Sequence, residues 1–135
     1  MKTLQAIIER ASDGGYGIYM PEIPGIGVTG ETEAEAKENL KDIIWMAIEH
    51  VEETGNDTYY APLMESHTIE FAYDLSGFFK TFNFFDVTAF SKRIGVNASL
   101  MRSYKTGMKK ASASQKSKIL EGIHSVADEL YAVRF

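Results

Sequence analysis

"DGGYGIYMPEIPGIGVTGET", residues 13–32, decides how the first half of this chain folds. Asp13-Gly14-Gly15 predicts a tight hairpin turn, because glycine accepts a positive φ at little cost. The apolar segments 3–10 and 16–20 on either side are typical of β-strands, and residues 26–30 predict a third, short strand. We therefore expect a small sheet to begin here.

The glycines of this stretch also suggest a phosphate-binding loop. Such a loop needs backbone NH groups that converge at the N-terminus of a helix. Gly14, Gly15 and Gly17 lie between two predicted strands instead. The stretch therefore favours a sheet scaffold over a phosphate site.

A long helix is predicted to follow the third strand. Thr32 is placed to cap it, Glu35 completes a capping box, and Gly55 ends it. Residues 56–66 predict a loop and residues 67–75 a fourth strand. The order βββαβ predicts an α+β fold, a small antiparallel sheet with one helix on its face. The apolar stripe of that helix comprises Ala36, Leu40, Ile43, Ile44, Ala47, Ile48 and Val51.

Two features of this helix have more than one interpretation. Trp45 lies about one residue off the apolar stripe, so it belongs either to the edge of the core or to an interface. The glutamates at the start of the helix favour its dipole, and no histidine stands near them. They indicate a solvated face rather than a metal site. These glutamates are Glu31, Glu33, Glu35 and Glu38.

The second half of the chain is predicted to be entirely helical, since every proline precedes residue 63. Residues 74–84, 86–95 and 97–107 predict three short helices, and residues 114–131 a longer one. The apolar face of the longer helix comprises Ile119, Leu120, Ile123, Val126, Ala127 and Leu130.

The stretch "FSKRIGVNASLMRSYKTG", residues 90–107, has the spacing of a helix-turn-helix. Phe90 and Ile94 are expected to face inward, Gly95 to make the left-handed turn, and Asn97 to cap the next helix. The positions expected to face DNA are Ala98, Ser99, Arg102 and Ser103. Surrounding residues expected to contact phosphates are Lys92, Arg93, Lys105, Lys109 and Lys110. A plain helical hairpin with a solvated basic face is the alternative.

The composition is that of an ordinary soluble protein. The 135 residues, 44% hydrophobic and 24% charged, suffice for one domain or two small ones. No apolar run is long enough to span a bilayer, there is no cysteine, and Glu9 and Arg10 interrupt any signal sequence, so we expect a cytoplasmic protein. We expect neither catalysis nor a metal or other cofactor, because the histidines, at positions 50, 67 and 124, are isolated.

Charge divides the chain into two parts. Residues 1–77 hold 15 acidic and four basic residues, whereas residues 78–135 hold four acidic and ten basic residues. Two modules with different partners are the simplest explanation. The acidic half should repel nucleic acid, and the basic half is suited to bind it.

The order of these motifs resembles the HicB family of antitoxins. The match lies in residues 13–44, with a DGGY turn, a Pro-Glu-Ile-Pro-Gly step, a Thr-Gly-Glu-Thr step and an Ala-containing helix. The helix-turn-helix is similar to those of phage repressors, which some members of the family carry. The resemblance implies a partial RNase H-like domain without nuclease activity, which binds and blocks a HicA-type RNA-cleaving toxin. It also implies a dimeric second domain that binds and represses its own operator.

These inferences together predict two domains, residues 1–75 for toxin binding and 76–135 for DNA binding and dimerisation. Residues 114–131, with Phe135 nearby, are the expected interface of a homodimer or dimer of dimers. Ala98 and Val87 depart from the repressor pattern, so base readout either rests on Ser99, Arg102 and Ser103 or is weak or lost. The expected toxin-facing residues are Tyr16, Tyr19, Pro21, Glu22 and Ile23.

Two other functions compete with an antitoxin. One is a stand-alone transcriptional regulator whose first domain senses a small molecule, which would require a deep apolar pocket. The other is a nuclease with an RNase H-like site, which would require a converging trio of carboxylates.

Overall fold

The computed structural model describes all 135 residues, which divide into two compact units, Met1–Thr81 and Phe82–Phe135. The division falls after Thr81 rather than after residue 75, where we placed it. The physical reason is that α3 (Leu75–Thr81) packs on the end of β1 (Lys2–Arg10). There the Arg10 amide donates a 3.1 Å hydrogen bond to the Ser76 hydroxyl.

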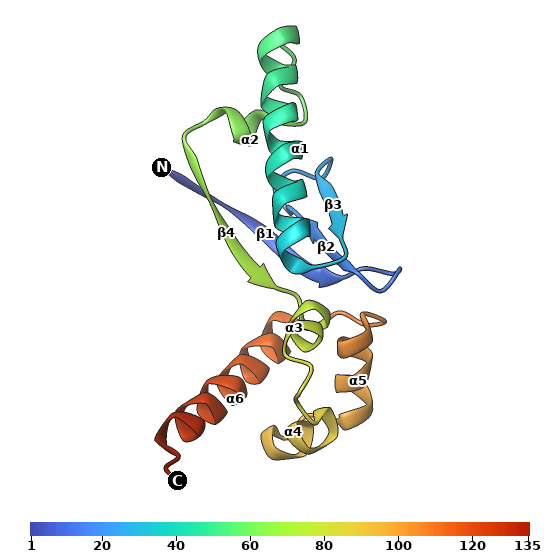
Figure 1. Ribbon diagram of the computed structural model, residues 1–135, viewed down its shortest axis with the longest axis vertical. Helices are drawn as coiled ribbons and strands as arrows, with labels where there is room; N and C mark the ends of the chain where they lie inside the picture. The colour runs from blue at the N-terminus through green and yellow to red at the C-terminus, as the bar shows by residue number, and fades with distance from the viewer. The chain divides into compact units, whose positions relative to one another are not determined.

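The first unit is a four-stranded sheet in the order β3-β2-β1-β4, covered on one face by α1 (Figure 1). The expected strands and the long helix are present, and a short helix, α2, interrupts the predicted loop. Besides β1 and α3, the elements are β2 (Tyr16–Tyr19), β3 (Gly27–Gly30), α1 (Glu33–Thr54), α2 (Ala61–Met64) and β4 (His67–Tyr73).

The sheet is mixed, and the expectation of a fully antiparallel sheet was wrong. β4 runs parallel to β1, with Leu4 opposite Ile69 and Ile8 opposite Tyr73. The two hairpins turn the chain twice, so β3 runs in the direction of β1. α1 then carries the chain back along the sheet, and β4 therefore enters in that same direction, as a helical crossover requires.

The core lies between α1 and the sheet. Alternate residues of β1, namely Leu4, Ala6 and Ile8, point towards α1 and are fully buried. The Thr32 hydroxyl caps α1 by accepting a 3.1 Å hydrogen bond from the Glu35 amide. The residues of α1 that are buried are Ala36, Leu40, Ile44, Ala47 and Val51.

Gly30 explains why β3 and α1 pack so closely. A Cβ atom at this position would lie 2.5 Å from the Ala36 amide nitrogen. Any other residue would push the start of the helix away from the strand. The glycine-rich stretch of residues 13–32 therefore acts as a scaffold.

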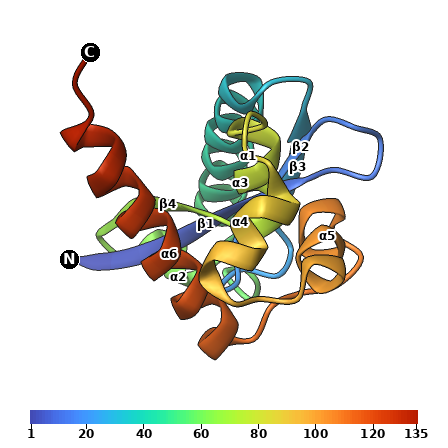
Figure 2. The same ribbon diagram turned by 90° about the horizontal axis from the view of Figure 1, so that it is seen from below.

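The second unit consists of α4 (Val87–Ile94), α5 (Ala98–Thr106) and α6 (Ala113–Ala132), with α4 between the other two (Figure 2). All three helices were predicted from the sequence. Gly95 ends α4 with φ of 75°, and the Asn97 side chain caps α5 through a 2.9 Å hydrogen bond from the Leu100 amide. The buried residues around this turn are Phe90, Val96, Met101 and Tyr104.

α6 is only loosely covered. Its expected apolar face contributes one buried residue, Ile119, whereas Leu120 is 51% and Leu130 is 63% exposed. Gly122 allows the close approach to α4, because a Cβ atom there would lie 2.5 Å from the Ile94 side chain. Much of the apolar stripe is therefore left open to solvent.

Candidate functional site

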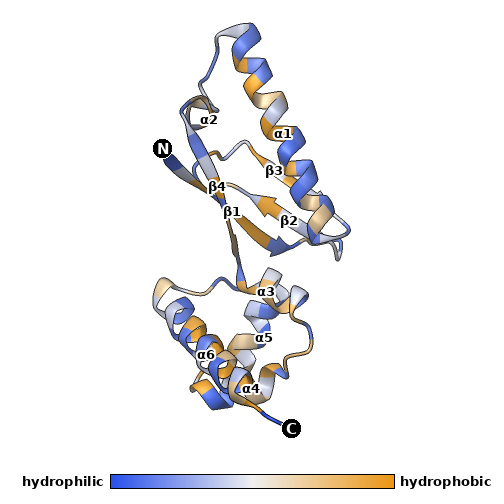
Figure 3. Ribbon diagram, turned by 60° about the vertical axis from the view of Figure 1, so that its left-hand side comes forward, coloured by the Kyte–Doolittle hydropathy of each residue, from blue (hydrophilic) through white to orange (hydrophobic).

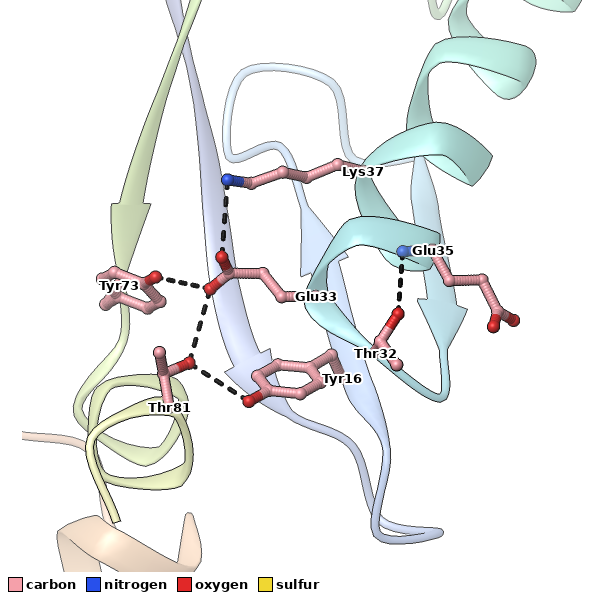
Figure 4. A network of polar contacts seen from close by, with 7 residues as sticks. All are labelled: Tyr16, Thr32, Glu33, Glu35, Lys37, Tyr73 and Thr81. Atoms are coloured by element: carbon pink, nitrogen blue, oxygen red, sulfur yellow. Dashed lines mark hydrogen bonds and ion pairs between the residues drawn. The ribbon is translucent and has the colours of Figure 1, made fainter. Parts of the chain in front are cut away.

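A polar network joins four elements of the first unit around Glu33 (Figure 4). The Glu33 carboxylate accepts hydrogen bonds from the Tyr73 hydroxyl at 2.5 Å and from the Thr81 hydroxyl at 3.4 Å. It also pairs with Lys37, one turn along α1, at 3.5 Å. Tyr16 completes the network through a 3.2 Å hydrogen bond between its hydroxyl and that of Thr81.

The network controls the ionisation of Tyr73. Burial is the largest cause that raises the pKa of its hydroxyl, and together with the hydrogen bond and negative charge of Glu33 it brings the pKa from 10.0 to about 12. Tyr73 therefore remains a neutral hydrogen-bond donor at physiological pH. This behaviour suits a clamp between β4, α1 and α3 rather than an acid–base catalyst.

The turn at residues 13–15 is a fixed hairpin turn. The Asp13 carboxylate accepts a 3.0 Å hydrogen bond from the Gly15 amide, and Gly14 has φ of 93°. The Lys80 ammonium donates to the Gly14 carbonyl at 2.5 Å and lies 5.1 Å from the centre of the Tyr16 ring. The turn is thus held by α3.

The expected toxin-facing residues do not form one surface. Tyr16 shares the core-facing side of β2 with Ile18, whereas Tyr19 lies on the opposite side of the sheet, beside Ile7. Pro21 and Glu22 are exposed in the loop that follows.

Ile23 was placed wrongly among the surface residues. Its side chain is 0% exposed and belongs to the core cluster. A short turn reverses the chain here, in which the Ile23 amide donates to the Met20 carbonyl and the Ile26 amide to the Ile23 carbonyl. The turn directs three apolar side chains, those of Met20, Ile23 and Ile26, inward.

The side of the sheet away from α1 carries a shallow hollow of about 430 Å³. Tyr19, Glu9 and Thr29 contribute to its lining. Tyr19 is 36% exposed, and Gly27, its partner on β3, is exposed as well, whereas Gly17 is buried. This is where the structure places the one exposed tyrosine of the predicted set.

The outer face of α1 carries large apolar side chains that the core leaves uncovered. Trp45 is 65% and Met46 58% exposed. Met46 also lines a groove of about 250 Å³ between α1 and the loops before and after it. The remaining residues of this groove, here called the α1 groove, are Gly25, Ile26, Ile43, Ala47, His50 and Tyr60.

In the second unit the predicted base-reading residues lie on α5. Ser99 and Arg102 are exposed, whereas Ser103 is half-buried and hydrogen-bonded to the Ser99 carbonyl at 3.3 Å. The Arg102 guanidinium donates to the Thr88 hydroxyl near the start of α4, at 3.2 Å. Ala98 is half-buried, so it offers little surface for base contact.

The predicted phosphate contacts are basic and mostly exposed. Lys92, Lys109 and Lys110 are exposed and Lys105 is half-buried. Arg93 forms an ion pair with Glu129 of α6, which partly neutralises it. Val87 is buried, so it is a core residue rather than a contact to the backbone of DNA.

Ligand sets for metals do not occur in this structure. No group of three or more His, Cys, Asp or Glu side chains is placed to hold a metal ion. His67 hydrogen-bonds through Nδ1 to the Glu65 carbonyl at 2.8 Å, and the His50 and Tyr60 rings lie edge to face.

A membrane-spanning helix was not expected, and no helix in the structure has the length and apolar character that spanning a bilayer requires.

Sequence reasoning missed two features of these surfaces. The Glu33 network joins residues up to 65 positions apart, so no local sequence pattern predicts it. The sequence did indicate the exposure of Trp45, because this residue lies off the apolar stripe of α1. The stripe alone does not distinguish a residue at the edge of the core from one at an interface.

Comparison with known proteins gives one informative similarity. The chain is 54% identical over 46 residues to "UPF0150 protein ssl0738" of Synechocystis sp. (strain ATCC 27184 / PCC 6803 / Kazusa). The aligned residues make up 34% of this chain and 64% of that protein. No family model matches the chain, and no solved structure matches it.

Proposed function

We propose that this protein is a HicB-type antitoxin, which neutralises a HicA-type RNA-cleaving toxin and represses its own operon. The observation that carries the proposal is the division of charge between the two compact units. Residues 1–81 hold 15 acidic and five basic residues, and residues 82–135 hold four acidic and nine basic residues. The acidic unit is complementary to a basic RNA-binding protein, and the basic unit to DNA.

Similarity supports the same proposal. UPF0150 is a HicB-like family, and the similarity to its Synechocystis protein agrees with the resemblance of the DGGY stretch to HicB antitoxins. On this proposal the first unit is a partial RNase H-like domain without nuclease activity.

The second unit would act as the operator-binding domain. α4 and α5 would form a helix-turn-helix, with α5 in the major groove and Ser99 and Arg102 at base edges. The partly uncovered stripe of α6 would join two copies, because a palindromic operator requires a two-fold dimer.

The proposal requires that a HicA-type protein is encoded next to this gene, and it is tested by co-expression of the two proteins. A complex that survives purification, and growth that is restored in cells making that protein, are expected. Separate elution of the two proteins, with growth still arrested, would refute the proposal.

A further inference from the structure

We propose that the toxin docks on the outer face of α1, through Trp45, Met46 and the carboxylates around them. The alternative surface is the side of the sheet away from α1, where Tyr19 lies, here called the β2 side. This inference rests on the proposed function and names the surface that performs it. The partner it requires is a basic protein that presents arginine or lysine side chains next to an apolar residue.

The first support is the exposure of Trp45. The buried positions of α1 recur every three or four residues, and Trp45 projects from the other side of the helix. At 65% exposure its indole remains largely in contact with water. Tryptophan is among the residues most enriched in interface hot spots, where a large aromatic ring anchors a partner.

The second support is the charge around the indole. Asp42 precedes Trp45 by one helical turn and Glu49 follows it by one turn, and neither enters an ion pair. The two lysines of α1 are already paired, Lys37 with Glu33 and Lys41 with Glu38, both at 3.5 Å. An aromatic face between two unpaired carboxylates is suited to a guanidinium or ammonium group of a partner.

The third support is the α1 groove beside this face. Met46 is 58% exposed and lines the groove, while Tyr59, 69% exposed, meets the ring of Tyr60 at its other wall. Figure 3 shows hydrophobic residues between hydrophilic ones along this part of α1. The surface therefore combines an apolar depression with an acidic surround, the two elements that a basic protein surface with an apolar anchor requires.

The β2 side of the sheet fits this role less well. The hollow there is lined by glycine, small polar and aliphatic residues besides Glu9, with Tyr19 as its single aromatic side chain. Of the other residues expected on that side, Ile23 is buried and Tyr16 is tied to Thr81 on the α1 side. No apolar anchor comparable to Trp45 is available there.

The test uses the full chain and the purified HicA-type protein encoded beside its gene. The chain contains a single tryptophan, so its intrinsic fluorescence reports Trp45 alone. We expect a blue shift of the emission on titration with the toxin, because the indole leaves water. Trp45→Ala should raise the Kd about 30-fold or more, the effect of a hot spot, and Glu49→Lys about tenfold.

Two matched controls separate docking from general attraction. Glu70→Lys makes the same charge change as Glu49→Lys, at an exposed position of β4 on the side of the sheet away from α1. It should alter the Kd by less than about threefold. Tyr19→Ala removes the exposed aromatic residue of the β2 side and should leave binding intact. Both variants, like Trp45→Ala, change exposed side chains, and their circular dichroism should match that of the wild type.

Each outcome is decisive. Tight binding with unchanged emission, and with Trp45→Ala equal to the wild type, would overturn this docking surface and leave the antitoxin function standing. A blue shift that depends on the protein's own concentration without toxin would assign the face to a second copy and also overturn it. Failure of the wild type to bind the toxin at all would remove the proposed function and this inference with it.

Discussion

The Tyr73 hydroxyl donates a 2.5 Å hydrogen bond to the Glu33 carboxylate, and this contact ties the end of β4 to the first turn of α1. The two residues are 40 positions apart in the sequence. Their contact exists because β4 enters the sheet parallel to β1, with Tyr73 opposite Ile8. An antiparallel β4 would place Tyr73 at the other end of the sheet.

The raised pKa of Tyr73 predicts a loss of stability at high pH. Deprotonation is harder in the folded protein, where the pKa is about 12, than in the unfolded chain, where it is about 10. The stabilisation is complete below pH 10 and is lost as the pH rises from 10 to 12. The tyrosinate absorbance of the wild type minus that of Tyr73→Phe should titrate near pH 12. A midpoint near pH 10 would contradict the account.

Gly77 predicts a second effect on stability. A Cβ atom at this position would collide with the Ile8 carbonyl, so Gly77→Ala should force α3 away from β1. We expect the free energy of unfolding to fall by about 1–3 kcal/mol in a urea titration. Gly27→Ala is the matched control, because its Cβ atom would meet only the Ile18 carbonyl, at 3.9 Å. Equal stability of Gly77→Ala and wild type would show that α3 does not pack as described.

Arg102 on α5 and Lys109 in the loop after it predict distinct effects on DNA binding. Arg102→Ala should weaken binding to the protein's own promoter DNA by about 1–3 kcal/mol and relax sequence preference. Lys109→Ala should weaken binding to all sequences and reduce the slope of log K against log salt by about 1. Lys41→Ala, a change in the acidic unit, is the control. Fluorescence anisotropy at several salt concentrations measures these effects. If Arg102→Ala keeps the sequence preference of the wild type, α5 does not read bases.

The exposed stripe of α6 predicts an effect on assembly. Leu130→Glu places a charge on that stripe and should convert a dimer to a monomer in sedimentation equilibrium. Ser125→Glu, an exposed position on another side of the helix, should leave the assembly unchanged. A wild type that is monomeric at all concentrations would remove α6 as a dimer interface.

Local signals predicted most elements of the fold. Turn and cap residues such as Asp13, Thr32 and Asn97 accept hydrogen bonds from amides two or three residues away, so their effects can be predicted from the sequence. The parallel pairing of β4 could not be predicted from the sequence, because it follows from the path of α1 across the sheet and not from the residues of β4. α2 was missed for a related reason: one turn of four residues has no periodicity to detect.

The candidate surfaces were less predictable than the fold. Tyr16 and Tyr19 are close in sequence, but the alternation of a strand directs them to opposite sides of the sheet. Ile23 lies between two prolines, a context typical of exposed loops, yet a turn buries it. Surfaces depend on which residues the tertiary structure leaves uncovered, and Trp45 became interpretable only once its exposure was known.

Neutralisation of an RNA-cleaving toxin is measured most directly as RNA cleavage by the HicA-type protein at increasing amounts of this chain. We expect cleavage to fall in proportion to the added protein and to stop at a stoichiometric ratio. Cleavage that continues unchanged at a large excess of this protein would contradict the proposed function.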